Sequence, residues 1–180
     1  MRNSIVFSII LGFMFLITGC NYPTLQEAIN NDIPYKVSEV IHTKKIDDIT
    51  VVLYTTEAKG EEFSYIKEPV LGVAFIKGNN KEGWKNDGPN GWEHYQNENY
   101  TIYYQPYTKY NEQGELLKDF DVVYGEINNK DIQKIEIAKQ GMKDFTETKM
   151  IKQGNKRYYL GIGYHPEVRA VSSNGEVINQ

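Results

Sequence analysis

The stretch that most constrains the fold is residues 49–56, which read Ile-Thr-Val-Val-Leu-Tyr-Thr-Thr. β-Branched and aromatic residues of this kind are enriched in strands, because they fit a pleated and half-buried surface. Apolar side chains fall on both faces of this stretch, so we expect a central strand that is covered on both sides. Residues 70–77 have the same character. The sequence therefore predicts an antiparallel sheet built around two buried strands.

A short helix is predicted before this sheet, over residues 25–31. Thr24 and Glu27 form a capping box, in which Thr24 caps the helix and Glu27 reaches back to its amide. Pro34 sets the end of the helix, because the residue before a proline avoids the α conformation. The apolar residues that share one face are Leu25, Ala28 and Ile29. A helix of about two turns is unstable in isolation, so we expect it to dock on the sheet.

The rest of the chain consists of short strand-like segments separated by turn residues. The expected strands cover residues 35–43, 100–104, 120–127, 132–138, 145–152, 158–164, 168–172 and 177–178, with a short hairpin partner at Trp84. Asn174-Gly175 is a strong hairpin signal, because both positions tolerate positive φ. The predicted class is α+β and mainly β: a short N-terminal helix on an antiparallel sheet, followed by a small all-β sandwich or meander.

Three segments are predicted along the chain. Residues 1–19 are expected to be removed, which leaves 180 − 19 = 161 residues for one domain or two small ones. We place a soft boundary near residue 115, between a helix-plus-sheet unit over 20–115 and an all-β unit over 116–180. The alternative is that the two halves share one core.

The first twenty residues have the pattern of an export signal. Arg2 is the only charged residue before Cys20, and the apolar block over residues 5–17 contains no charge. As a helix at about 1.5 Å per residue, this block would be roughly 20 Å long. That is short against a hydrocarbon core of about 30 Å but typical of the apolar region of a signal peptide.

The segment that follows, Ile17-Thr18-Gly19-Cys20, resembles the lipobox of bacterial lipoproteins. The resemblance implies that the Cys20 thiol is diacylated with palmitate-type chains, that cleavage occurs before Cys20, and that the mature protein is anchored on the extracytoplasmic face of the cell membrane. Two acyl chains anchor a protein stably, whereas one does so only marginally. An uncleaved membrane helix with an incidental cysteine is the alternative. The specific part of the resemblance covers residues 1–20. Residues 21–180 are similar in texture to small uncharacterised lipoproteins of low-GC Gram-positive bacteria and contain no diagnostic motif.

Charge and cysteine content agree with this location. Removal of Arg2 gives a mature net charge of (20 − 1) − 24 = −5. No basic stripe is present, so a nucleic-acid partner is not expected, nor is a polybasic contact with an anionic bilayer. Cys20 is the only cysteine, so the fold contains no disulfide and the lipid would use its sulfur.

No catalytic or cofactor signature is present in the sequence. It lacks a G-x-S-x-G elbow, a P-loop, a His-Glu-x-x-His helix and a free thiol nucleophile. The three histidines, His42, His94 and His165, stand at no metal-ligand spacing. Three acidic residues could form a carboxylate group, although a solvated strand edge is the simpler interpretation: Asp119, Asp121 and Glu126. We therefore expect no catalytic residues, no metal and no cofactor.

The aromatic content is the one unusual feature of composition, with 14 Tyr and 2 Trp. Rings beside amide and carboxylate groups suit a glycan-binding face or a peptide groove, but they equally suit the core of a β protein. The ligand-binding candidates are Trp84, Trp92, Tyr95 and Tyr103. Tyr103 and Tyr104 must point to opposite faces of one strand, so a single surface holds only one of them.

The expected function is that of a membrane-anchored, non-enzymatic binding or accessory protein of the cell envelope. Its partner would be a cell-wall glycan, a peptide or a membrane protein, in addition to the membrane held through Cys20. One alternative is a wall- or peptide-active enzyme with a novel site near Trp92-Glu93-His94 or near Asp119 and Asp121. Another is an immunity-type lipoprotein that protects its producer from a toxin.

Overall fold

The computed structural model describes residues 21–163 and 166–180, so Cys20 and His165 lie outside the described residues. The helical elements are α2 (Leu25–Asn31) and the 3-10 turn η1 (Glu61–Phe63). The strands are β1 (Glu39–Ile46), β2 (Ile49–Thr56), β3 (Val70–Asn79), β4 (Gly83–Asn86), β5 (Gly91–Glu93), β6 (Tyr103–Tyr110), β7 (Leu116–Glu126), β8 (Ile132–Lys139), β9 (Thr146–Glu147), β10 (Lys149–Gln153), β11 (Lys156–Gly163), β12 (Pro166–Ser172) and β13 (Val177–Ile178). The mainly β, α+β class is confirmed.

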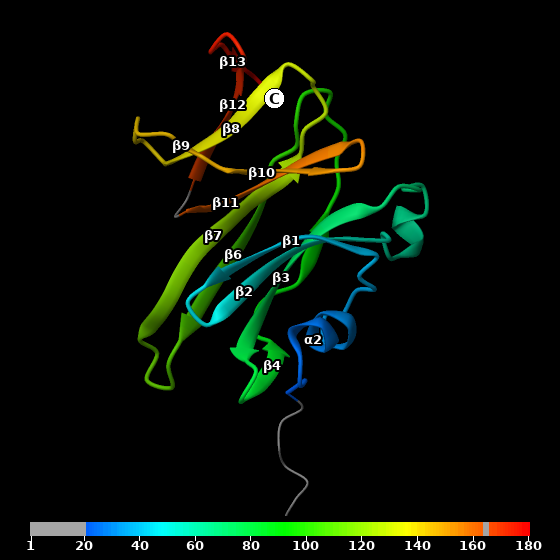
Figure 1. The fold of residues 1–180 in the computed structure, drawn as a ribbon, viewed down its shortest axis with the longest axis vertical. Helices are drawn as coiled ribbons and strands as arrows, with labels where there is room; N and C mark the ends of the chain where they lie inside the picture. Colours follow the sequence, from blue (N-terminus) through cyan, green and yellow to red (C-terminus); the bar gives the residue numbers. More distant parts are fainter. Residues whose placement is uncertain (1–20, 164–165) are drawn as a thin grey trace, which may run out of the picture.

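The strands form three antiparallel sheets. The first sheet has the order β1-β2-β3-β4, with β5 also paired to β3. The middle sheet has the order β10-β11-β7-β6, and the outer sheet has the order β13-β12-β8-β9. Figure 1 shows them stacked, with α2 beside the first sheet at the lower right and the outer sheet at the top. The result is four layers: the helix and then the three sheets.

Each interface between layers has its own hydrophobic core. The helix core joins α2 to the first sheet, the central core joins the first and middle sheets, and the outer core joins the middle and outer sheets. Every residue of β2 is buried. Val52 and Tyr54 pack in the helix core, whereas Val51 and Leu53 pack in the central core. The prediction of a central strand covered on both faces is confirmed.

The helix begins and ends where its sequence predicts. The Thr24 hydroxyl accepts a hydrogen bond from the Glu27 amide at 3.2 Å, and the helix spans Leu25–Asn31. Ala28 and Ile29 are buried against the first sheet. Because a helix of seven residues has little stability of its own, burial of this face is what keeps it folded.

The chain joins the first sheet before the helix begins. The Tyr22 amide donates to the Trp84 carbonyl at 2.7 Å, and the Trp84 amide donates to the Tyr22 carbonyl at 2.8 Å. The side-chain amide of Asn21 also donates to the Glu82 carbonyl at 2.8 Å. The chain is therefore fixed to the edge of β4 from its first described residues.

Residue 115, near the predicted domain boundary, lies in the turn between β6 and β7. These two strands pair along their length, from Tyr103 opposite Tyr124 to Tyr110 opposite Leu116. The central core also combines residues from both sides of this position, such as Val73 and Leu160. The described residues of the two halves thus share a core, as in the alternative stated above.

The first strand differs from its predicted range. It covers Glu39–Ile46 rather than residues 35–43, and the turn to β2 contains only Asp47 and Asp48. Asp47 adopts a positive φ of 53°, which aspartate tolerates better than most residues. Lysines at positions 44 and 45 do not end β1, because it is an edge strand whose side chains reach solvent.

Candidate functional site

Two of the four predicted ligand-binding aromatics are core residues. Trp84 is 8% exposed in the helix core, and its indole nitrogen donates to Asn80 Oδ1 at 3.1 Å. Tyr103 is 5% exposed in the central core, where its ring lies 5.4 Å from that of Tyr124. Burial in these cores leaves neither the Trp84 ring nor the Tyr103 ring accessible to a ligand.

The other two predicted aromatics lie near one another in the chain and are partly accessible. Trp92, on β5, is half-buried and contacts Phe63 edge to face, with ring centroids 4.9 Å apart. Tyr95 is exposed, and its hydroxyl accepts a hydrogen bond from the Ile102 amide at 2.6 Å. Its ring also lies edge-on to that of Tyr103 at 5.1 Å. Each of these two rings therefore packs edge to face against a neighbouring ring, Trp92 against Phe63 and Tyr95 against Tyr103.

A small polar pocket lies beside Tyr95, where β3, β6 and β11 begin and β7 ends. Its volume is about 230 Å³. His94 Nε2 lies 3.5 Å from Glu68 Oε1, and Lys156 Nζ lies 3.0 Å from Glu126 Oε1. The remaining lining residues are Pro69, Tyr95, Gln96, Asn97, Thr101 and Asn128. The pocket thus combines one histidine with two carboxylates and an ammonium group.

The predicted carboxylate group is divided between two places. Glu126 lines the polar pocket, whereas Asp121 lines a separate groove. The third member, Asp119, is exposed and accepts a hydrogen bond from the Thr108 hydroxyl at 2.9 Å. In residues 21–163 and 166–180, no group of three or more His, Cys, Asp or Glu is placed to hold a metal ion.

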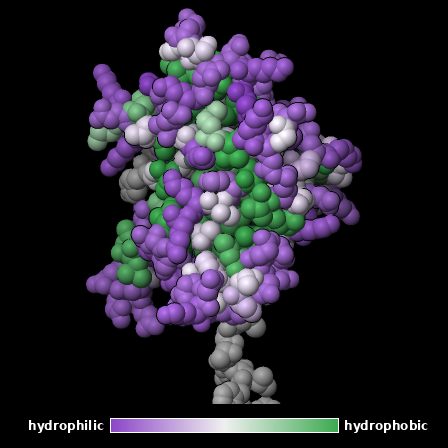
Figure 2. Space-filling view, viewed as in Figure 1, coloured by the Kyte–Doolittle hydropathy of each residue, from purple (hydrophilic) through white to green (hydrophobic). Residues whose placement is uncertain are grey.

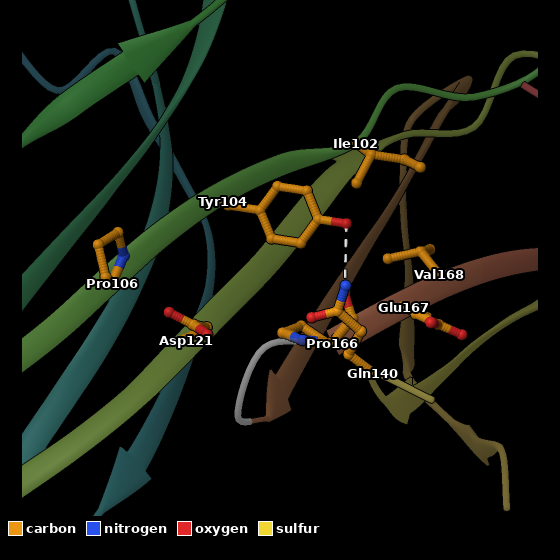
Figure 3. A pocket seen from close by; sticks show the side chains of 8 residues that line it. All are labelled: Ile102, Tyr104, Pro106, Asp121, Gln140, Pro166, Glu167 and Val168. Atoms are coloured by element: carbon orange, nitrogen blue, oxygen red, sulfur yellow. Dashed lines mark hydrogen bonds between the residues drawn. The ribbon is translucent and has the colours of Figure 1, made fainter. Parts of the chain in front are cut away.

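A groove with a volume of about 790 Å³ lies between β6 and β12. Its lining residues are Ile102, Tyr104, Pro106, Asp121, Gln140, Pro166, Glu167 and Val168. Figure 3 shows Tyr104 at its centre, with Pro106 and Asp121 on one side and Ile102 and Val168 on the other. The groove forms because β6 is the edge of the middle sheet, while β12 belongs to the next layer.

Tyr104 is the main aromatic surface of this groove. Tyr104 is 44% exposed. Its hydroxyl donates a hydrogen bond to the Pro166 carbonyl at 3.3 Å (Figure 3). Burial of the hydroxyl raises the pKa of Tyr104, with nearby Tyr95 and Tyr100 adding to the shift. The hydroxyl therefore remains protonated and bonded at neutral pH, and the ring face is left for contact with a ligand.

Two prolines and two acidic residues determine the chemistry of the groove. Pro106 is tolerated in β6 because an edge strand lacks a neighbour on one side. The Glu167 carboxylate accepts a hydrogen bond from the Gly141 amide at 3.1 Å and is exposed. Asp121 lies opposite Pro106 on β7. Such a groove suits a ligand with apolar faces and few negative charges.

Sequence reasoning placed Tyr104 on the face opposite Tyr103 but did not select it as a candidate. The alternation of β6 carries the relevant signal, because Tyr103 and Tyr107 are buried while Tyr104 and Pro106 are exposed. The pattern does not reveal which of the two faces another sheet covers. The partner wall, at Pro166, lies 62 residues away in sequence.

The described part of the chain contains no helix of sufficient length and apolarity to cross a bilayer. Comparisons of the chain with protein-family models, with curated proteins and with solved structures gave no match.

Proposed function

We propose that this protein is a membrane-anchored extracytoplasmic lipoprotein that acts as a non-enzymatic binding or accessory protein of the cell envelope. In this proposal Cys20 carries the lipid, and the groove around Tyr104 holds the partner. The observation that supports the binding role most strongly is an exposed aromatic ring at the centre of the groove between β6 and β12, between two prolines. Large pockets with an apolar lining and a few polar groups are the usual places for ligands.

The position of Tyr22 supports the anchoring role. Tyr22 is already paired with Trp84, and only Asn21 separates it from Cys20. A chain spans at most about 3.6 Å per residue, so a lipid on Cys20 would hold the folded body against the membrane. This arrangement suits a protein that works on a partner close to the bilayer surface.

The anchor is tested on the native protein. Mass spectrometry of protein purified from membranes should find an acylated Cys20 at the N-terminus, and the Cys20→Ser variant should be released from the membrane fraction. An intact Met1 or a free thiol at position 20 would refute the anchor.

The binding role is tested with a photo-crosslinking amino acid in place of Tyr104. The matched control is the same substitution at Tyr65, which is 72% exposed and does not line the groove. We expect the crosslinker at position 104 to capture a defined partner, and the crosslinker at position 65 not to capture that partner. Binding of purified wall polymer, compared between the wild type and Tyr104→Ala, tests a glycan partner in the same way. Equal crosslinking from positions 104 and 65, together with equal polymer binding by the wild type and Tyr104→Ala, would contradict the groove assignment.

The polar pocket supports one alternative, a wall- or peptide-active enzyme with a novel site. His94, Glu68 and Glu126 surround the same small space, and proton transfer between a positioned side chain and a substrate requires groups of this kind. Glu126→Gln and His94→Ala should then abolish the cellular role without loss of stability. If both variants keep every wild-type phenotype, the pocket has no catalytic role.

A further inference from the structure

The free end of the β6–β7 hairpin carries three large apolar side chains that no other layer covers. Tyr110 is 57% exposed, Leu116 is 55% exposed and Leu117 is 59% exposed. Tyr110 and Leu116 are paired directly across the hairpin. Figure 2 shows green side chains over this end of the hairpin, at the lower left, among purple neighbours. Exposed apolar clusters of this kind mark surfaces that contact something else.

Ion pairs place this hairpin end beside the turns of the first sheet. Lys118 of β7 pairs with Asp47 at 3.2 Å and also with Asp48, in the turn between β1 and β2. Asp48 in turn pairs with Lys77, near the end of β3, at 3.2 Å. Lys77 lies opposite Lys85 of β4. The hairpin end, the β1–β2 turn and β4 are therefore at one end of the molecule.

The N-terminal part of the described chain lies at the same end. Tyr22 pairs with Trp84 of β4, and Asn21 contacts the Glu82 carbonyl in the turn before it. Figure 1 shows the hairpin end, β4 and the first described residues along the lower side of the molecule. The outer sheet and the C-terminus are at the opposite, upper side (Figure 1).

We propose that the end of the β6–β7 hairpin is a second membrane contact, in which Tyr110, Leu116 and Leu117 rest in the bilayer interface. This inference rests on the proposed lipid at Cys20. An anchor one residue before Asn21 would bring this end of the body to the membrane surface, because the intervening chain is too short to separate them. Tyrosine and leucine side chains are suited to the boundary between headgroups and acyl chains.

The charges around the hairpin end favour an apolar contact over an electrostatic one. Its turn carries Glu112 and Glu115, and its flanks carry Lys109 and Lys118, so the charges of residues 109–118 sum to zero. Both lysines are held in ion pairs, with Asp87 and with the β1–β2 turn respectively, so their charges are already compensated by carboxylates. The apolar side chains at the tip need no charge complementarity with a lipid surface. The contact should therefore persist at high salt.

The contact would give the body a fixed orientation. An anchor at a single residue lets a domain rotate about it, whereas a second contact across the molecule prevents that rotation. The outer sheet, which supplies one wall of the groove through Pro166 and Val168, would then be held away from the bilayer.

The experiment uses the mature, acylated protein, with Cys20 at its N-terminus, in vesicles of phosphatidylglycerol and phosphatidylethanolamine. Because the lipid occupies the sulfur of the only cysteine, a Leu117→Cys substitution introduces a single site for an environment-sensitive fluorophore. Val177→Cys is the matched control, since Val177 is also apolar and 53% exposed but lies on the outer sheet. We expect a blue shift and severalfold stronger quenching by spin-labelled lipid at position 117 than at position 177, unchanged in high salt.

The outcomes separate this inference from the anchor. If the acylated protein floats with vesicles and the two labels remain equally aqueous, the hairpin contact is wrong and the anchor stands. If the protein does not associate with vesicles at all, the anchor fails. A blue shift at position 117 that occurs in native membranes but not in pure lipid vesicles would identify a protein partner and overturn the lipid assignment. As a second measurement, Tyr110→Ser in the labelled Leu117→Cys protein should weaken the quenching at position 117, whereas Tyr65→Ser should not.

Discussion

The Tyr107 hydroxyl donates a 2.8 Å hydrogen bond to the Asp87 carboxylate, which also receives an ion pair from Lys109 at 2.9 Å. Tyr107 stacks on Phe120 within the central core, with ring centroids 5.1 Å apart. Asp87 belongs to the loop after β4, and its side chain is only 8% exposed. This bond therefore connects a loop of the first sheet to the middle sheet through a buried carboxylate.

Replacement of Asp87 by Asn should lower the free energy of unfolding at pH 7 by about 1–3 kcal/mol, because Tyr107 and Lys109 would lose a charged acceptor. Burial raises the pKa of Asp87, but the hydrogen bonds from Lys109 and Tyr107 outweigh it and leave the pKa below its usual value. The stabilisation from Asp87 is thus present at pH values above the pKa that Asp87 has in the unfolded chain. It decreases as the pH falls through the lower pKa that Asp87 has in the folded protein. Urea unfolding should be measured at pH 7 and at acidic pH. The difference in free energy of unfolding between the wild type and Asp87→Asn should be smaller at the acidic pH. Asp119→Asn, at an exposed carboxylate, is the control, and an equal loss there would contradict this account.

Asp48 should dominate the acid sensitivity of the end of the molecule that contains the β1–β2 turn. The hydrogen bond from Lys118, supported by Lys77, lowers the pKa of Asp48 from 3.8 to about 2 against the opposing effect of burial. Its contribution is therefore complete above pH 3.8 and is lost as the pH falls toward 2. We expect Asp48→Asn to reduce stability at pH 7 by about 1 kcal/mol or less, since the groups are partly exposed. In an acid titration followed by circular dichroism, the signal of Asp48→Asn should change less steeply than that of the wild type between pH 3.8 and 2. An equal slope for the two proteins would count against the pairing of Asp48 with Lys118 and Lys77.

The elements that were predicted well are those determined by local chemistry. The helix Leu25–Asn31 follows from a capping residue at one end and a proline beyond the other. Strand β2, Ile49–Thr56, follows from a run of residues that suit a buried strand, bounded by polar turn residues. In both cases the side chains that determine the structure lie within a few residues of it.

The stacking of the sheets depends on contacts that are distant in sequence. Trp84 is buried because Tyr22 pairs with it and α2 packs beside it, and neither relationship is visible from the residues around Trp84. The groove likewise needs β6 and β12, which belong to different sheets. Alternation assigns Tyr103 and Tyr104 to opposite faces, but only the order of the layers determines which of them is exposed.

Trp84→Ala should destabilise the fold rather than remove a binding function. The indole is buried in the helix core and its nitrogen is bonded to Asn80, so we expect a loss of about 3–5 kcal/mol in the free energy of unfolding. Trp92→Ala removes the same side chain from a half-buried position on β5 and should cost less. Denaturant unfolding followed by circular dichroism would measure both variants. A fully stable Trp84→Ala protein would show that this indole is not part of the core.

The chain around Gly125 should tolerate an added methyl group poorly. A Cβ at Gly125 would lie 2.0 Å from the Thr101 carbonyl oxygen. Thr101 cannot easily move away, because its carbonyl accepts a 2.8 Å hydrogen bond from the Tyr159 hydroxyl, and its own hydroxyl accepts one from the Glu126 amide at 2.8 Å. Gly125→Ala should therefore lower the free energy of unfolding by at least about 1–3 kcal/mol, through overpacking against a fixed backbone.

Gly163 provides the matched control for this substitution. It also lies in a strand of the middle sheet, but among the described residues an added Cβ would come no closer than 3.4 Å to another side chain, that of Pro166. Gly163→Ala should change stability by less than about 0.5 kcal/mol, as is usual for substitutions that create no clash. Thermal and urea unfolding of the two variants under the same conditions would measure the difference. Equal stability of the two proteins would mean that Thr101 and the start of β6 yield more readily than their hydrogen bonds to Tyr159 and Glu126 indicate.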